Sequence, residues 1–259
     1  MQLSVVIITH NEEANISRTL ASVQPLVADG KGEIIVVDSG STDRTVEIAK
    51  SRGAKVFVEE WKGYATQKNS AIAKASGDWV LSLDGDEEID SGLQQVLCDV
   101  CGGKLDTPFA GLWLHRKNEF LGRWIKRGGY WPDPKLRFFR RGTGRFEDRA
   151  VHEDVRLVGT THRIPIGTII HRSYPTLSDY IDHMNRYSSL GAEMVVAKGK
   201  VRFSFINIVV RPLFTFIYNY FFRLGFLDGR EGLLLHLYHA VYVSWKYAKA
   251  WELSRNKQA

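Results

Sequence analysis

The stretch Trp79-Val80-Leu81-Ser82-Leu83-Asp84-Gly85-Asp86 decides how this chain is interpreted. It predicts a buried strand that ends in two carboxylates separated by one glycine. Side chains at positions i and i+2 of an extended segment point the same way, so Asp84 and Asp86 could together hold a divalent cation bridged to a diphosphate. The same triplet also suits a polar turn, because glycine tolerates a positive φ and aspartate bonds nearby backbone. The surrounding sequence favours the cation site.

Strand and helix patterns alternate up to this stretch. Runs of β-branched residues predict strands over residues 3–9, 33–38 and 55–58, each followed by a helix, and the last helix is expected over 64–75. The resulting β-α-β-α-β-α-β order predicts a parallel sheet with right-handed crossovers. In the first helix we expect Asn11 to act as the cap and Pro25 to end the apolar repeat.

Ligands of such sheets bind at the carboxyl ends of the strands. Polar residues follow three of the predicted strands, at 10–12, 38–43 and 84–86. We therefore expect three strand ends to converge on one crevice.

Composition limits the protein class. The chain has 259 residues, of which 44% are hydrophobic and 25% charged, so it can bury one large α/β core or two halves of one. The first residues lack the basic region of a secretory signal, so we expect a cytoplasmic protein. The lone Cys-x-x-Cys at Cys98 and Cys101 lacks the further ligands of a zinc site, which favours reduced thiols without a special role.

Charge is distributed unevenly along the chain. Residues 1–115 carry 10 basic and 17 acidic side chains, residues 116–163 carry 13 and 6, and residues 198–259 carry 10 and 3. The acidic first part fits a metal site, whereas the basic segments suggest anionic partners such as phosphorylated glycans or lipid headgroups, or simply a solvated basic face. No recognised nucleic-acid-binding motif accompanies the charge, so we expect no nucleic-acid partner.

The last sixty residues are predicted to be helical. The aromatic and apolar stretch 203–222 is interrupted by Arg211-Pro212 and Asn219, so it is not expected to span a membrane but could lie in the headgroup layer. A second helical stripe is formed by Leu234, Leu237, Val241, Trp245 and Ala248. That stripe either packs on the protein's own core or contacts a membrane.

Four motifs closely resemble family 2 glycosyltransferases of the GT-A fold. They are Val5 to Glu12, Val36 to Asp43, Gln67-Lys68-Asn69, and Leu83 to Asp86. Later segments resemble the branch that includes lipopolysaccharide core glucosyltransferases: Phe120 to Trp124, Lys135 to Phe139, Val151-His152-Glu153 and Leu227 to Gly232.

The resemblance implies a nucleotide-sugar site, with a GT-A fold of the Rossmann-like, mostly parallel α/β type. Thr9, Asn11, Glu12 and Ser41 would line the nucleotide pocket, Asp38 would hydrogen-bond a uracil ring, Lys68 would lie near the diphosphate, and Asp84 would contact the ribose or the metal. Asp86 would ligate Mg²⁺ or Mn²⁺, which with the lysine would neutralise the departing diphosphate. His171 would be a further metal ligand, or a hydrogen-bonded structural histidine.

The resemblance also suggests the catalytic base and the acceptor side. Glu153 matches the position of the base, with Asp154 as the alternative, unless both only pair with Arg149 and Arg156. Trp124 and Tyr130 could stack on acceptor sugars or belong to a core, and Arg127 and Arg137 could bind phosphate or carboxylate.

We therefore expect a metal-dependent, inverting transfer of a hexose, with glucose as first choice, from a UDP-sugar to a membrane-anchored glycolipid, most simply the lipopolysaccharide inner core. The expected parts are a nucleotide-sugar-binding half (1–104), an acceptor-binding half (105–197) and C-terminal amphipathic helices (198–259). The enzyme would lie on an anionic membrane surface, at the inner face of the cell membrane. The alternatives are a polyprenyl-phosphate glycosyltransferase, a nucleotidyltransferase, and a non-catalytic basic binding module.

Overall fold

The computed structural model of the chain describes residues 2–105, 108–147, 155–199 and 201–256. The chain divides into two compact units. The first, here called the sheet unit, comprises Met1–Arg116 and Asp133–His171, and the second, the helical unit, comprises Lys117–Pro132 and Arg172–Ala259. Residues 117–132 and 172–197, expected in the acceptor-binding half, group here with the C-terminal helices.

Four parallel strands form the part of the sheet that the sequence predicts. They are β1 (Leu3–Thr9), β2 (Gly32–Asp38), β3 (Lys55–Val58) and β4 (Trp79–Asp84), in the order β3-β2-β1-β4. The register pairs Thr9 with Asp38 and Ile8 with Asp84. The carboxyl ends of β1, β2 and β4 therefore lie side by side, as expected.

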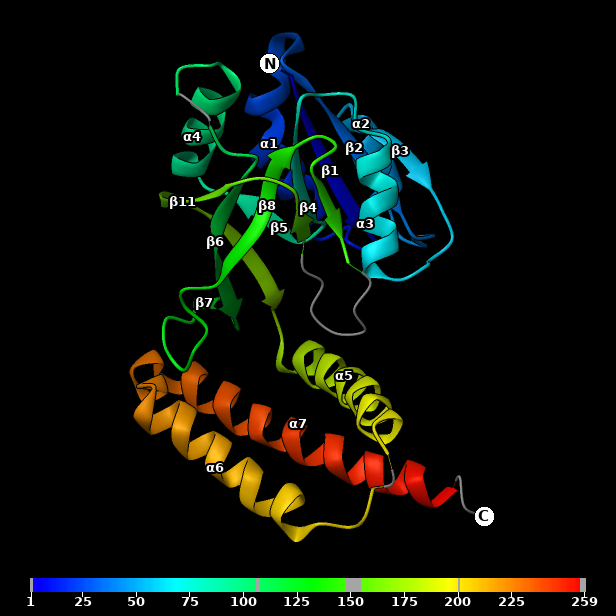
Figure 1. The fold of residues 1–259 in the computed structure, drawn as a ribbon, viewed down its shortest axis with the longest axis vertical. Helices are drawn as coiled ribbons and strands as arrows, with labels where there is room; N and C mark the ends of the chain where they lie inside the picture. The colour runs from blue at the N-terminus through cyan, green and yellow to red at the C-terminus, as the bar shows by residue number, and fades with distance from the viewer. Residues whose placement is uncertain (1, 106–107, 148–154, 200, 257–259) are drawn as a thin grey trace. The chain divides into compact units, whose positions relative to one another are not determined.

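Helices cover both faces of these strands, which explains their unbroken apolar runs. Val5 and Ile7 of β1 belong to a core shared with α1 (Ile16–Val27), α2 (Thr45–Ser51) and α4 (Ser91–Cys101). Val6 and Ile8 face the other way, toward α3 (Tyr64–Ala73). Figure 1 shows α4 and α3 on opposite sides of β1.

The sheet continues beyond β4 with antiparallel pairing. The order is β4-β8-β6-β11-β5, with bounds β5 (Glu87–Ile89), β6 (Gly111–Phe120), β8 (Pro134–Arg140) and β11 (Thr161–Tyr174). Short β7 (Arg123–Trp124) pairs with β6, and β9 (Gly144–Phe146) pairs with β10 (Val155–Leu157). The α/β fold class with a helical C-terminal region is confirmed.

Two predicted helix boundaries are wrong. Asn11 does not cap α1, which begins at Ile16, because Asn11 adopts a positive φ of 55° and its side chain instead accepts a hydrogen bond from the Thr42 N–H. Pro25 does not end α1 either. Proline inside a helix removes one backbone hydrogen bond, but the two residues after it, which complete the helix, are buried in the core and offset that loss.

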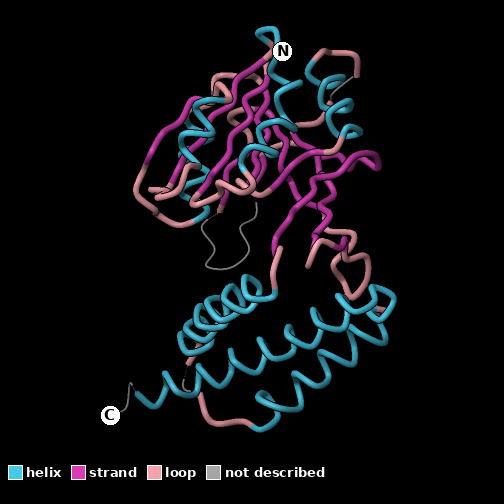
Figure 2. Tube along the Cα trace, turned by 180° about the vertical axis from the view of Figure 1, so that it is seen from behind, coloured by secondary structure: helices cyan, strands magenta, loops and turns pink. Residues whose placement is uncertain are grey.

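The helical unit has its own small core. It contains α5 (Leu177–Ala197), a helical segment from Ile206 to Phe222 in which α6 (Arg211–Ile217) is flanked by π-helical turns, a 3₁₀ turn (Gly225–Asp228) and α7 (Gly229–Asn256). α7 packs against α5 and α6 (Figure 2). Phe120, Ile125, Tyr180 and Leu235 form the buried centre.

The expected apolar stripe of α7 is buried only in part, and Leu234 of it packs against the small core of this unit. The buried apolar residues of this helix are Leu235, Ala240, Val243 and Ala250, whereas Leu237 of the expected stripe is exposed. In the described part of the chain, no helix has both the length and the apolar character needed to cross a bilayer.

Candidate active site

Two loops at the ends of β1 and β2 are joined by hydrogen bonds. The Asn11 N–H donates to Ser41 Oγ (2.8 Å), and the Glu12 N–H donates to Thr45 Oγ1 (2.8 Å). Asp38 is fully buried, and its carboxylate accepts hydrogen bonds from the Gly40 and Ser41 N–H groups and the Ser41 hydroxyl. Asp38 therefore shapes the loop that follows β2.

The Asp84-Gly85-Asp86 segment is a turn between β4 and β5. The Asp84 N–H donates to Glu87 Oε2 (3.0 Å), and the Gly85 carbonyl accepts from the Thr19 hydroxyl (2.8 Å). A Cβ at Gly85 would lie 2.9 Å from both Thr9 Oγ1 and Glu12 Cγ, so close packing requires glycine there. The turn and the cation-site interpretations of the sequence are thus compatible.

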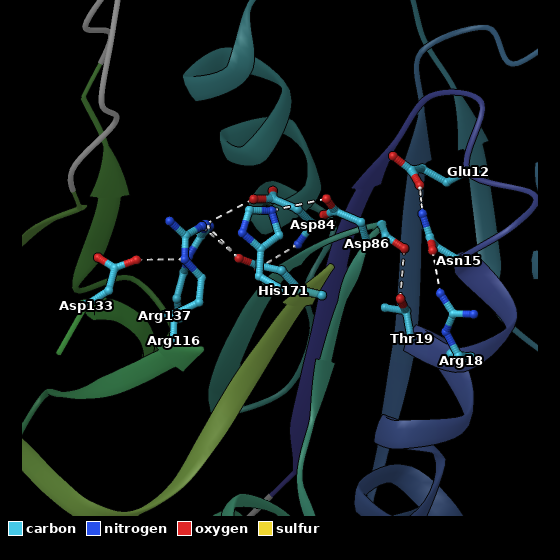
Figure 3. A network of polar contacts seen from close by, with 12 residues as sticks. Glu12, Asn15, Arg18, Thr19, Asp84, Asp86, Arg116, Asp133, Arg137 and His171 are labelled. Carbon is cyan, nitrogen blue, oxygen red and sulfur yellow. Dashed lines mark hydrogen bonds and ion pairs between the residues drawn. The ribbon is translucent and has the colours of Figure 1, made fainter. Parts of the chain in front are cut away.

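Asp84 is held between two cations. Lys68 Nζ lies 2.9 Å from Oδ1. Arg137 Nη2 lies 3.0 Å from Oδ2 (Figure 3). Burial alone would raise the pKa of Asp84, but the charges of Lys68 and Arg137 outweigh it and hold that pKa well below its usual range. The Lys68 side chain is only 2% exposed, so Asp84 provides a counter-charge to a buried ammonium group.

Asp86 pairs with His171, which is 85 residues away in the sequence. The distance from Asp86 Oδ2 to His171 Nε2 is 3.1 Å. Antiparallel pairing of β5 with β11 sets His171 opposite Glu87, the residue next to Asp86, and so brings the two side chains together. Burial would raise the pKa of Asp86, but His171 outweighs it and lowers that pKa, which favours the ionised carboxylate.

A second charge network, missed by the sequence analysis, supports the turn. Glu87 is fully buried, and Arg116 Nη1 lies 3.1 Å from its Oε1. The Arg116 guanidinium also contacts Asp133 at 2.9 Å (Figure 3). The sequence does contain a signal for this network, because Glu87 is a third acidic residue directly after Asp84 and Asp86. A polar turn alone does not require three carboxylates.

Glu12 lies near the negative charge of Asp86. Burial, followed by the charge of Asp86, raises the pKa of Glu12 to about 7, although a hydrogen bond from Asn15 partly opposes the shift. The Asn15 amide donates to Glu12 Oε2 at 2.7 Å (Figure 3). Neutral pH therefore falls in the range where Glu12 gains or loses its charge.

Asn69 holds Phe146 by both of its backbone groups. The Asn69 amide donates to the Phe146 carbonyl and accepts from the Phe146 N–H, each at 2.9 Å. The Phe146 ring lies beneath two cations of the site, with Lys68 Nζ at 5.3 Å and Arg137 Cζ at 5.7 Å from its centroid. The Gln67-Lys68-Asn69 motif thus supplies both a counter-charge for Asp84 and an anchor for β9.

Residues 4–157 match the family model described as glycosyl transferase family 2. The chain belongs to glycosyltransferase family 2. An uncharacterized glycosyltransferase of Rickettsia typhi is 32% identical over 98% of this chain and 88% of its own length. The lipopolysaccharide core biosynthesis glycosyltransferase LpsC of Rhizobium meliloti is 29% identical over 97% of this chain and 93% of its own.

Solved structures of glucosyl-3-phosphoglycerate synthase from Mycobacterium tuberculosis are also similar. One, with Mn²⁺, UDP and glucosyl-3-phosphoglycerate, has 28% identity and a TM-score of 0.37, and the likeness covers 46% of this chain and 44% of that one. Another, with Mg²⁺ and UDP, has 29% identity and a TM-score of 0.36. The likeness thus covers less than half of each chain.

The donor set of this glycosyltransferase fits a divalent cation that is shared with a substrate. Among the described residues, no group of three or more His, Cys, Asp or Glu side chains is arranged to enclose a metal ion. Asp86 and His171 offer one oxygen and one nitrogen side by side. Mg²⁺ commonly binds through one or two protein carboxylates plus substrate phosphates and water, so a partial protein site is what such an ion requires.

The remaining sequence-predicted site residues fall in different places. Trp124, Arg127 and Tyr130 belong to the helical unit, and Arg137 lies in the sheet unit beside Asp84. Tyr130 packs on the small core of the helical unit, where burial raises its pKa to about 12. Glu153 and Asp154 lie outside the described residues.

Proposed function

We propose that this glycosyltransferase moves a hexose, with glucose as first choice, from a UDP-sugar to a membrane-anchored glycolipid, the lipopolysaccharide inner core. The observation that carries the proposal is the pairing of Asp86 with His171 beside an Asp84 that is held by Lys68 and Arg137. The full-length similarity to LpsC supports the acceptor class.

In this proposal each part of the site has one task. Thr9, Asn11, Ser41 and Asp38 shape the nucleotide pocket at the strand ends. Asp86 and His171 would hold Mg²⁺ or Mn²⁺, which supplies positive charge to the leaving diphosphate. Lys68 and Arg137 keep Asp84 ionised and fixed. Glu153 removes the proton of the acceptor hydroxyl while that oxygen attacks the anomeric carbon opposite the UDP, which inverts the configuration.

Turnover of UDP-glucose, UDP-galactose and UDP-N-acetylglucosamine, with and without Mn²⁺, tests the donor and the metal. We expect metal-dependent release of UDP that Asp86→Asn reduces at least 100-fold, because the variant loses a charged ligand. Asp29→Asn is the matched control, since Asp29 is an exposed aspartate whose positive φ asparagine also adopts. Metal-independent turnover, or none with any UDP-sugar, would favour a binding module, and release of pyrophosphate would favour a nucleotidyltransferase.

The catalytic base is tested separately. We expect Glu153→Gln to keep UDP affinity and to lose transfer to delipidated lipopolysaccharide core, while Asp154→Asn keeps both. Retained transfer by Glu153→Gln would move the base elsewhere. Transfer to a polyprenyl phosphate instead of the core oligosaccharide would identify the alternative acceptor.

An exposed apolar face supports a membrane partner. The segment from Phe203 to Leu227 exposes a series of large side chains: Phe203, Phe205, Ile206, Val209, Val210, Leu213, Phe214, Phe221, Phe222, Phe226 and Leu227. Phe222 is 74% exposed and Phe214 is 64% exposed. Arg202, Arg211 and Arg223 occur along this stretch, and cations next to exposed aromatic residues suit an anionic bilayer surface.

Vesicle flotation tests this membrane contact. We expect wild-type protein to float with vesicles containing phosphatidylglycerol and the Phe214→Glu/Phe222→Glu variant to stay behind. Val158→Glu is the control, because Val158 is 76% exposed but belongs to the sheet unit. Equal flotation of the double variant and the Val158→Glu control would refute the contact. If light scattering shows a wild-type dimer and a monomeric double variant, the face binds a second copy of the chain instead.

A further inference from the structure

The helical unit contains a pocket of ≈ 670 Å³ that lies apart from the metal site and shares only Leu227 with the apolar face. Its lining comes from two stretches of the chain. One contains Arg123, Trp124, Lys126 and Arg127. The other contains Asp228, in the turn before α7, and Glu231, in the first turn of α7. We call it the loop pocket. All of these residues belong to one compact unit, so its shape depends on that unit alone.

Asp228 fixes the backbone of this pocket. Its side chain is buried, and its carboxylate accepts hydrogen bonds from the N–H groups of Lys126 (3.1 Å) and Arg127 (2.8 Å). The turn that carries Asp228 is tight, since a Cβ at Gly232 would lie 2.3 Å from the Gly225 carbonyl oxygen. The negative charge of Asp228 thus serves two backbone amides.

The side chains of Lys126 and Arg127 remain as exposed cations. Among the described residues neither has a carboxylate within ion-pair distance, whereas Arg123 contacts Glu231 at 3.5 Å. Lys126 Nζ lies over the Trp124 ring, 4.5 Å from its centroid, which holds the ammonium group at the pocket. Two cations on a backbone that a buried carboxylate fixes are arranged to receive an anion of two or more oxygens.

We propose that the loop pocket binds a phosphate group of the acceptor, carried on a sugar. The proposal rests on the proposed transfer to an anionic glycolipid and adds the chemical group that the enzyme recognises. Lys126 and Arg127 would bind the phosphate oxygens, and Asp228 would act as a positioning residue that holds the two cations together. The same phosphate chemistry could come from a phospholipid headgroup, so the test separates the two sources.

Binding of glucose 6-phosphate to the full-length protein, followed by calorimetry, tests the proposal, with glucose as the uncharged comparison. We expect glucose 6-phosphate to bind and glucose not to bind. The Lys126→Gln/Arg127→Gln variant should lose at least 10-fold in affinity for glucose 6-phosphate while its affinity for UDP stays unchanged. Arg255→Gln is the matched control, because Arg255 is another exposed arginine of this unit beside a tryptophan, Trp251.

Several results would overturn the inference. Equal affinity of the double variant and the wild type for glucose 6-phosphate would do so, and so would displacement of glucose 6-phosphate by UDP, which would place the phosphate in the donor site. If the double variant loses binding only to vesicles containing phosphatidic acid, the pocket is a lipid-headgroup site and the sugar assignment is overturned. Asp86→Asn should leave glucose 6-phosphate binding intact, so failure of the proposed transfer and failure of this pocket are distinguishable.

Discussion

Asp84 and Asp86 are two residues apart in the sequence, yet their surroundings give them different duties. The Asp84 carboxylate forms ion pairs with Lys68 and Arg137, whereas Asp86 pairs with His171 (Figure 3). The charge of Asp84 is thus balanced within the protein, and Asp86 is the carboxylate better placed to bind an added cation.

We expect Asp84→Asn to destabilise the fold on the order of 3 kcal/mol, because removing one partner of a buried pair leaves the other charge uncompensated. The buried partner here is Lys68. Asp86→Asn should cost much less stability, since its partner His171 has 18% of its side chain exposed, against 2% for Lys68. Urea unfolding of the two variants in metal-free buffer measures the difference. Equal losses of unfolding free energy would contradict the different roles assigned to Asp84 and Asp86.

Glu12 predicts a dependence of stability on pH. Its folded pKa of about 7 exceeds the ordinary value of 4.5, so between these pH values the folded state binds more protons than the unfolded state. The free energy of unfolding therefore falls as pH rises from about 4.5 to 7, by up to about 3 kcal/mol. Glu12→Gln cannot ionise, so it should match the wild type near pH 5 and be more stable than it at pH 8.

The neighbouring Glu13 is the control for this experiment. It is exposed, and its hydrogen bonds with Arg44 lower its pKa, so Glu13→Gln should lack the gain at pH 8. Melting temperatures at both pH values measure the effect. Adding Mn²⁺ at pH 8 should narrow the gap between wild type and Glu12→Gln, because a cation at Asp86 would favour the ionised Glu12.

Single residues show where sequence analysis succeeds and where it stops. The sequence places Lys68 on a helix near the carboxyl end of β4, and the structure sets it against Asp84; its contact with a diphosphate stays a prediction. Arg137 as an acceptor residue stays a prediction, and the sequence contains no signal for its pairing with Asp84 across β4 and β8. Asp228 belongs to the Leu227 to Gly232 motif, but its hydrogen bonds with the Lys126 and Arg127 amides join residues about 100 positions apart and leave no sequence signal.

Among the secondary-structure elements, the parallel strands were predictable, whereas the short antiparallel strand β5 was not. A strand buried on both faces leaves a continuous β-branched run, as in Leu3–Thr9. β5 has three residues, two of them glutamates, and its existence depends on pairing with β11. The contact between Asp86 and His171 follows from that pairing. From the sequence, only the resemblance to a glycosyltransferase family suggested that both residues lie near one metal ion.

Asn69 gives a prediction about the position of β9. Asn69→Ala removes both hydrogen bonds to the Phe146 backbone, and we expect a loss of about 1–3 kcal/mol in stability because that buried backbone is left unpaired. Because Phe146 also lies beneath Lys68, UDP affinity should fall as well. Asn69→Asp keeps the acceptor for the Phe146 N–H and should lose less. Unchanged stability in Asn69→Ala would show that β9 is held elsewhere.

For the molecule as a whole, the C-terminal helices are part of a core as well as a surface. Leu235 of α7 is buried with Phe120, Ile125 and Tyr180, all of which precede residue 198. We therefore expect a chain truncated after residue 197 to expose this core and to aggregate or melt at lower temperature, rather than to lose membrane binding alone. Light scattering and thermal unfolding measure this, and a monomeric truncated protein of unchanged melting temperature would contradict it.

The helical unit is assembled from two separate stretches, Lys117–Pro132 and Arg172–Ala259. Recombination at a single crossover point would therefore combine one stretch of this unit from the host with the other stretch from a relative. The Lys126 and Arg127 amides of the host would then face a turn from the relative in place of the host's own Asp228. Chimeras meant to exchange acceptor preference between relatives need two crossovers, so that Asp228 travels together with the loop whose shape it sets.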